Sequence, residues 1–228
     1  MKKLALTGGI AYVIIFITGI FANFNVMETM RDLNSILNTY NNLKEGQDLL
    51  LMGIISFVVM LIADFVVTLV LCKLFHETDS KLNMRSSTFR MINVIFFGIA
   101  LYFLYDVYSL LQVSSEPANE MRMALAVDNA LNTFDTIWLI GLIFFGIHLV
   151  LLSKVLDKAK NIHRSISALL FIAGVGYVVD SCLHLFYWDY ASISHISTII
   201  VVLPGLIGEL SLTFRILLKG IRKQPAVC

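Results

Sequence analysis

Carboxylates and histidines placed inside long apolar segments are the residues of this sequence that could do chemistry. Five apolar segments contain one carboxylate each, and the five are Asp64, Asp106, Asp135, Asp180 and Glu209. If these segments cross a bilayer, a charge at its centre costs at least about 2.5–3.5 kcal/mol. No lysine or arginine is expected at the same depth as a partner. We therefore expect each carboxylate to face the interior of a helical bundle, where it is neutral, hydrogen-bonded, or balanced by a proton or cation.

Depth along the helices, counted at about 1.5 Å per residue, divides the polar residues into two layers. The outer layer lies about 21–22 Å from the predicted cytoplasmic ends and comprises Asp106, Asp135, Asp180, His184, Tyr102 and Tyr177. The inner layer lies about 9–13 Å from those ends and comprises Asp64, His148 and Glu209. Each tyrosine precedes a carboxylate by three or four residues, so its phenol is placed to donate a hydrogen bond to it. The outer layer is interpreted as a network that specifies helix packing, as a proton or substrate site, or as a metal site.

The sixth apolar segment carries a predicted helix break beside its carboxylate. In LPGLIGELSL, Pro204 cannot donate a backbone hydrogen bond, and Gly205 and Gly208 weaken the helix further. Several transporters build their sites at interrupted helices of this kind, although proline-kinked spans also occur without a site. Because no basic partner is expected for Glu209, burial favours its neutral, protonated form. The competing interpretation is a hydrogen bond from Glu209 to Asp64 or His148 that only holds three helices together.

The composition indicates that membrane-spanning helices position these residues. The chain is 58% hydrophobic and 14% charged, with a mean hydropathy of +0.82, whereas soluble domains are about 45–50% apolar and about 25% charged. Six apolar segments match or exceed the ~20 residues of a spanning helix, and none shows the period-2 alternation of a barrel strand; they are residues 4–24, 49–72, 91–113, 130–153, 166–187 and 196–218. We predict an all-α integral membrane bundle of six transmembrane helices in a single domain, residues 1–228. This composition excludes a soluble enzyme, and the net charge of +1 gives no case for nucleic-acid binding.

The placement of positive charge predicts the orientation of the bundle. All but three of the 17 lysine and arginine residues lie at the termini or in the second and fourth connections, the exceptions being Arg31, Lys44 and Arg122. Because cytoplasmic segments are enriched in these residues, the N-terminus and the C-terminus are both predicted to be cytoplasmic. The first segment is interpreted as an uncleaved helix, since its apolar run exceeds the roughly 7–15 residues of a signal core.

The long external connection, residues 25–48, is predicted to contain an amphipathic helix after the first span. Asn25 and Glu28 have the spacing of a capping box at its start. Apolar residues follow at steps of three and four, at Val26, Met30, Leu33, Leu37 and Tyr40. Such a helix either covers the exposed ends of the bundle or forms a lid over a site.

Four stretches of the sequence resemble a family of membrane proteins. They are GGIAYVIIFITGIFA (8–22), FFGIHLVLL (144–152), GVGYVVDS (174–181) and LPGLIGELSLTFRILLKG (203–220). Together they resemble, over nearly the whole chain, the family catalogued as domain of unknown function 4386. The resemblance implies a multi-pass protein of the bacterial inner membrane, and it implies no activity and no cofactor. The matching positions include His148, Asp180 and Glu209, and the burial expected within apolar segments points to the same three residues.

The function expected from these residues is that of a small transporter or sensor. Its buried carboxylates would serve a proton, a cation or a small polar solute, with the lipid bilayer as the surrounding partner and the oligomeric state undefined. A structural or assembly subunit is one alternative, and an intramembrane metal-dependent hydrolase is another. The hydrolase is disfavoured because His148 and His184 differ in depth by roughly 18 Å, far beyond a metal–ligand distance of about 2 Å. The sequence shows no Walker loop, GxSxG or HExxH motif, so no catalytic residue, metal or cofactor is expected.

Overall fold

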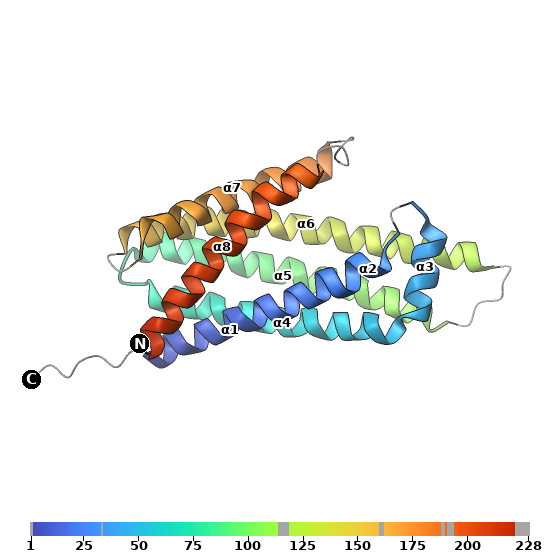
Figure 1. Cartoon of the computed structure of the whole chain (residues 1–228), viewed down its shortest axis with the longest axis horizontal. Helices are drawn as coiled ribbons and strands as arrows, with labels where there is room; N and C mark the ends of the chain where they lie inside the picture. The colour runs from blue at the N-terminus through green and yellow to red at the C-terminus, as the bar shows by residue number, and fades with distance from the viewer. Residues whose placement is uncertain are drawn as a thin grey trace, which may run out of the picture. The chain divides into compact units, whose positions relative to one another are not determined.

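The chain is predominantly helical in the part described by the computed structural model, which comprises residues 2–32, 34–113, 119–159, 162–187, 190 and 194–221. No strand occurs among these residues. In chain order the elements in Figure 1 are α1 (Lys2–Ile20), the π-helix η1 (Phe21–Met27), α2 (Glu28–Met30), α3 (Ile36–Glu45), α4 (Gln47–Leu74), α5 (Ser80–Leu111), α6 (Glu120–Lys158), α7 (Arg164–Phe186) and α8 (Ser194–Ile221). The predicted all-α class is therefore confirmed.

Five helical segments of the described chain are long and apolar enough to cross a membrane. They are Lys2–Met30, Gln47–Leu74, Ser80–Leu111, Glu120–Lys158 and Arg164–Phe186. At a rise of about 1.5 Å per residue, even the shortest exceeds a hydrocarbon layer of about 30 Å. The sixth predicted span falls on α8, which has 28 residues. Its crossing of the membrane and the orientation of the termini stay predictions.

Two of the helices begin well before the apolar segments from which they were predicted. α5 begins at Ser80, because the backbone N–H of Leu82 donates to Asp79 Oδ1 at 3.0 Å and Asp79 thereby caps the helix. α6 begins at Glu120, and its first turns bury Ala124, Val127 and Leu131 at steps of three and four residues. An amphipathic stretch thus extends each helix beyond its purely apolar part.

The first connection differs from the capping-box prediction. Asn25 lies inside the helical run that continues through η1 and α2 to Met30, so the predicted helix start at Asn25 is wrong. The backbone becomes extended at Arg31, and Ser35 Oγ accepts a hydrogen bond from the Asn38 N–H at 3.2 Å at the start of α3. α3 is amphipathic and buries Thr39, Tyr40 and Leu43. Leu33 of the predicted pattern lies outside the described residues, and the external position of this segment stays a prediction.

Asp79 closes the short connection between α4 and α5. Besides capping α5, it accepts a hydrogen bond from Lys158 Nζ at 2.7 Å through Oδ2. These bonds, with that from Lys158 first, hold the pKa of Asp79 below its usual value. The ion pair therefore stabilises the fold above the unfolded-state pKa of about 3.9, and the contribution is lost as the pH falls through the folded pKa.

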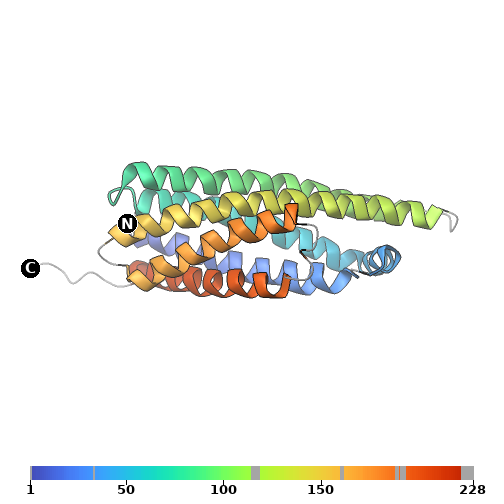
Figure 2. The same cartoon turned by 90° about the horizontal axis from the view of Figure 1, so that it is seen from above.

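The chain divides into two compact units, and four of the long helices contribute residues to both. The first unit comprises residues 1–13, 63–94 and 139–228, and the second comprises residues 14–62 and 95–138. Within the first unit α7 and α8 lie side by side, as Figure 1 and Figure 2 both show. Within the second unit, Trp138 stacks on Phe97 with ring centroids 3.7 Å apart and also contacts Phe57 and Phe134. Each unit therefore has its own packed interior.

Glycines set the closest helix contacts of the first unit. A Cβ at Gly146 of α6 would lie 2.6 Å from the carbonyl oxygen of Gly174 in α7, and the reverse holds as well. A Cβ at Gly205 or Gly208 of α8 would meet α7 side chains at 3.1–3.4 Å. Gly205 and Gly208 therefore allow α8 to approach α7, a role that the helix-break prediction did not include. α8 is helical through Pro204, so the predicted break is limited to the backbone hydrogen bond that proline cannot donate.

Candidate functional site

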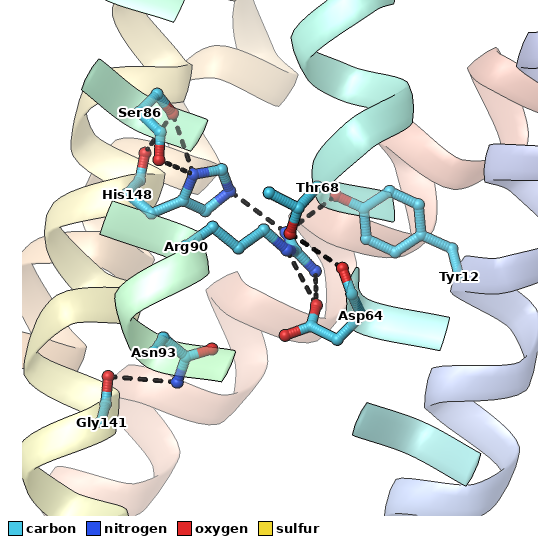
Figure 3. Close-up of polar contacts among 8 residues, drawn as sticks. All are labelled: Tyr12, Asp64, Thr68, Ser86, Arg90, Asn93, Gly141 and His148. Atoms are coloured by element: carbon cyan, nitrogen blue, oxygen red, sulfur yellow. Dashed lines mark hydrogen bonds and ion pairs between the residues drawn. The ribbon is translucent and has the colours of Figure 1, made fainter. Parts of the chain in front are cut away.

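Arg90 of α5 is the centre of a buried polar cluster in the first unit. Its side chain is 1% exposed, and both Nε, at 2.8 Å, and Nη2 donate to Asp64 Oδ1 on α4. Nη1 donates to the Tyr12 hydroxyl of α1 at 3.3 Å and to His148 Nε2 of α6 at 3.1 Å. The guanidinium carbon also lies 5.3 Å from the ring centroids of Tyr12 and Phe145. Figure 3 shows the Arg90 side chain extending between His148 and Asp64. The expectation that no basic residue pairs with Asp64 is therefore wrong.

His148 is held in a single hydrogen-bonding arrangement. Its Nδ1 lies 2.9 Å from both the backbone oxygen and the hydroxyl oxygen of Ser86 on α5. Since a carbonyl only accepts, Nδ1 carries the proton, and Nε2 is left to accept from Arg90. The Ser86 hydroxyl in turn donates to the His148 carbonyl at 3.1 Å. His148 thus acts as a neutral acceptor that orients Arg90.

A polar stripe on α5 brings these partners into the bundle. Asn83, Ser86, Arg90 and Asn93 follow one another at steps of three and four residues, and each is at most 1% exposed. Asn93 Nδ2 donates to the Gly141 carbonyl of α6 at 3.1 Å (Figure 3). Residues at this spacing share one helix face. The stripe is readable in the sequence, and it is the signal that would have identified Arg90 as a residue of the interior.

Glu209 of α8 adds a second carboxylate to the surroundings of Arg90. It is 7% exposed, and its Oε1 has no hydrogen-bond partner among the described residues. Arg90, Asp64 and Tyr12 lie near enough to Glu209 for electrostatic interactions with its carboxyl group. Its backbone carbonyl accepts from the Thr213 hydroxyl at 2.7 Å. The three residues of the predicted inner layer, Asp64, His148 and Glu209, thus lie around one arginine, and Glu209 is the member with an unsatisfied side-chain oxygen.

In the second unit, Asp135 also has a basic partner that the sequence analysis did not expect. Arg31 Nη1 donates to Asp135 Oδ2 at 2.6 Å, joining the segment after α2 to α6. The side chains are 22% and 36% exposed, so this pair is far more accessible than Arg90–Asp64. Asp106 is half-buried and Tyr102 is 66% exposed, so Tyr102 is no buried donor. These outer-layer residues lie in the second unit and the other three lie in the first, so a shared outer layer stays a prediction.

The outer end of α7 has a small polar cluster of its own in the first unit. The Tyr190 hydroxyl donates to Asp180 Oδ1 at 2.7 Å, a role that the sequence analysis had given to Tyr177. His184 is exposed and stacks on the Tyr190 ring, with centroids 4.1 Å apart. Tyr177 instead packs edge-on against Phe145 of α6 at 5.3 Å. Asp180, His184 and Tyr190 therefore form a group one to two helical turns beyond Tyr177.

These arrangements suit proton chemistry better than metal chemistry. Within the described residues, no group of three or more histidine, cysteine, aspartate or glutamate side chains is placed to hold a metal ion. The Arg90 cluster instead contains the Arg90 guanidinium and the Asp64 carboxylate that is paired with it. It also contains the Glu209 carboxyl group, whose Oε1 has no hydrogen-bond partner among the described residues. Such a group can accept a proton or a hydrogen-bond donor with little rearrangement.

The family of this chain is shown by comparison with known proteins. The model of the family described as domain of unknown function (DUF4386) matches residues 7–220. The chain belongs to the DUF4386 family. The resemblance expected from the four sequence stretches is thereby confirmed, and the match includes every residue of the Arg90 cluster.

A sequence similar to this chain comes from an archaeon. An uncharacterized protein of Archaeoglobus fulgidus is 26% identical over 175 residues, which cover 77% of this chain and 88% of that protein. No solved structure matches the chain. The family and the apolar helices together support a membrane protein, and the chemistry has to be argued from the cluster itself.

Proposed function

We propose that this DUF4386 protein is a proton-responsive multi-pass membrane protein, a small transporter or sensor, in which Glu209 takes up and releases a proton beside Arg90. The observation that carries the proposal is the buried Oε1 of Glu209, which has no hydrogen-bond partner among the described residues. The helices long enough to span a membrane and the family match support a location in the cell membrane. We further propose that this is the inner membrane of a bacterium.

The charges of the cluster explain why Glu209 is the titrating group. Arg90 and Asp64 compensate each other through two hydrogen bonds to one carboxylate oxygen. His148 and Tyr12 are neutral partners of the remaining Nη1. An ionised Glu209 adds a second negative charge that this single arginine only partly balances, whereas a protonated Glu209 adds none. Binding of a proton, or of a cation or donor group in its place, therefore changes the net charge of the buried cluster.

The site is also placed to couple that charge to helix movement. Glu209 lies on α8, five residues after Pro204, while Arg90 and Asp64 lie on α5 and α4. Protonation weakens the attraction of Glu209 to Arg90, and deprotonation strengthens it. Because α8 lacks one backbone hydrogen bond at Pro204, it can bend there. Transport and sensing both require such a link between protonation and conformation.

The test is the substitution Glu209→Gln, which retains shape and hydrogen bonding but cannot titrate. Purified protein in lipid nanodiscs is titrated from about pH 5 to about pH 8, which a buried glutamate can reach, and the infrared band of protonated carboxylic acids is followed. We expect the parent to show a titrating band that Glu209→Gln lacks. Glu45→Gln is the matched control, since Glu45 is exposed in α3, and it should retain the band.

The same variants then separate transport from sensing. In proteoliposomes with an internal pH dye, Glu209-dependent proton movement after an external acid pulse identifies transport. A Glu209-dependent conformational change without proton movement identifies a sensor. If the titrating band and both responses are the same in Glu209→Gln and the parent, Glu209 is a packing residue and the proposal fails.

Two other functions are weaker on the same observations. A structural or assembly subunit accounts for the paired Arg90 and Asp64, but it gives no reason for the unpartnered oxygen of Glu209. An intramembrane metal-dependent hydrolase needs a ligand cluster, and none of that kind lies within the described residues.

A further inference from the structure

We infer that Tyr177 relays protons between Asp180 and Glu209, so that α7 provides the proton route to the Arg90 cluster. The inference rests on the proposed function of Glu209 and names the residues that serve it. The Tyr177 hydroxyl lies against Gly205 of α8, one turn before Glu209, and Asp180 follows Tyr177 by three residues on α7. A phenol between two carboxyl groups can donate to one and accept from the other.

The contact between α7 and α8 fixes Tyr177 beside Glu209. A Cβ at Gly205 would lie 3.4 Å from both the hydroxyl oxygen and Cε2 of Tyr177, so the phenol lies directly over this glycine. Glu209 follows Gly205 by four residues and therefore shares its helix face, one turn further along. The edge-on contact with Phe145 holds the other side of the Tyr177 ring. The hydroxyl is thus positioned by three helices and not by a flexible segment.

The other end of the route reaches the exposed end of α7. Asp180 lies three residues after Tyr177, on the same face of the helix. It accepts from the Tyr190 hydroxyl at 2.7 Å, and the exposed His184 stacks on Tyr190. A proton entering there has carboxyl and phenol groups to follow towards Glu209.

The relay step leaves Tyr177 chemically unchanged. Its O–H bond breaks as the proton passes to the ionised Glu209 carboxylate, and a new O–H bond forms with the proton from a protonated Asp180. Asp180 is left ionised and is reprotonated from the His184 end. No oxidant or reductant takes part. The charged and titratable groups around the receiving Glu209 are Arg90 of α5, Asp64 of α4 and Tyr12 of α1.

The test is the substitution Tyr177→Phe, which removes the relaying hydroxyl and keeps the ring against Phe145. The protein in nanodiscs is subjected to a rapid pH drop, and the carboxylic acid band that depends on Glu209 is followed in time. We expect the final amplitude to match the parent and the rate to fall by at least about tenfold, because a positioned proton-transfer group contributes about 10²–10⁴-fold. Tyr102→Phe is the matched control, since Tyr102 is 66% exposed, and its rate should be that of the parent.

The outcomes separate this inference from the proposed function. Asp180→Asn should slow the same step, because asparagine cannot pass a carboxyl proton. Parent-like rates in both Tyr177→Phe and Asp180→Asn would overturn the relay while leaving the Glu209 titration intact. A reduced amplitude in Tyr177→Phe would also overturn it, since the tyrosine would then be supporting the carboxylate and not supplying it. Absence of a Glu209-dependent band in the parent would remove the proposed function itself.

Discussion

Arg90 shows how a charge is accommodated in the interior of a membrane protein. Its guanidinium uses all three nitrogens, on Asp64, Tyr12 and His148, and rests near two aromatic rings. Each partner comes from a different helix, so the cost of burying the charge is distributed over contacts that also fix how those helices pack. A buried pair of this kind contributes little net stability when intact, and removing one partner leaves an uncompensated charge.

The first prediction compares the buried ion pair Arg90–Asp64 with the partly exposed ion pair Arg31–Asp135. Asp64→Asn should lower the free energy of unfolding by about 3–5 kcal/mol, because Arg90 is then buried without a counter-charge. Asp135→Asn is the matched control, and it should cost less than about 1 kcal/mol because its pair with Arg31 is partly exposed. Unfolding by denaturing detergent measures both. Equal losses in the two variants would contradict the assignment of Arg90–Asp64 as the buried pair.

At this scale the sequence indicated the carboxylates but not their partners. Asp64, His148 and Glu209 are recognisable in the sequence because they lie deep within apolar segments, and the structure brings them around one arginine. Hydropathy places Arg90 in a connection, because the apolar run begins directly after it, at residue 91. Hydropathy likewise places Arg31 in a loop. Hydropathy averages over a window, whereas the direction of a single side chain depends on the helix face, which only the polar stripe of α5 reveals.

At the scale of whole helices, the close contacts of the first unit depend on glycine residues. The backbones of α6 and α7 approach at Gly146 and Gly174, where neither residue has room for a Cβ. Small residues allow such approaches in membrane bundles, where packing and not hydrophobic burial drives helix association. The contact keeps Tyr177 and His148 at fixed positions on adjoining helices.

The second prediction follows from that contact. A Cβ at Gly174 would lie 2.6 Å from the Gly146 carbonyl oxygen and 2.8 Å from the Val150 nitrogen. Backbone atoms cannot yield as side chains do, so Gly174→Ala should cost about 1–3 kcal/mol in unfolding free energy. Gly98→Ala is the control, because its nearest neighbour would be Leu61 Cδ2 at 3.6 Å, and it should be neutral or stabilising by up to about 1 kcal/mol. A neutral Gly174→Ala would show that the two helices do not meet there.

Helix positions were predictable from the sequence to a greater degree than helix ends. Each apolar segment lies within a helical run to within two residues at its end, because continuous apolar runs of this length have no other stable form in lipid. The ends depend on local hydrogen bonds that hydropathy does not report, such as the Asp79 cap of α5 and the Ser35 cap of α3. Asn25 and Glu28 have the right spacing for a cap, but the π-helix Phe21–Met27 continues the first helix through Asn25 into α2, which begins at Glu28. Residue spacing alone cannot distinguish a cap from the interior of a continuing helix.

For the molecule as a whole, the third prediction concerns orientation in the membrane. In a parent whose native cysteines are replaced by alanine, Glu45→Cys should react with an impermeant thiol reagent added to intact cells. Glu77→Cys should react only after the membrane is opened. Both side chains are exposed, so accessibility differs only through the side of the membrane. The basis is the enrichment of lysine and arginine in cytoplasmic segments. Labelling of Glu77→Cys in intact cells would reverse the orientation.

The Arg90–Asp64 pair has a consequence for how the protein is made. α4 is the most apolar of the five candidate spans, so it can enter the bilayer although Asp64 is still unpaired. When α5 follows, Arg90 stands at the end of its apolar run, where a long side chain can reach the lipid headgroups. We expect the closing of the two helices around the short connection 75–79 to draw Arg90 inward to Asp64. The pair thus makes α4 and α5 a unit of biogenesis, a helical hairpin whose first helix is completed by its second.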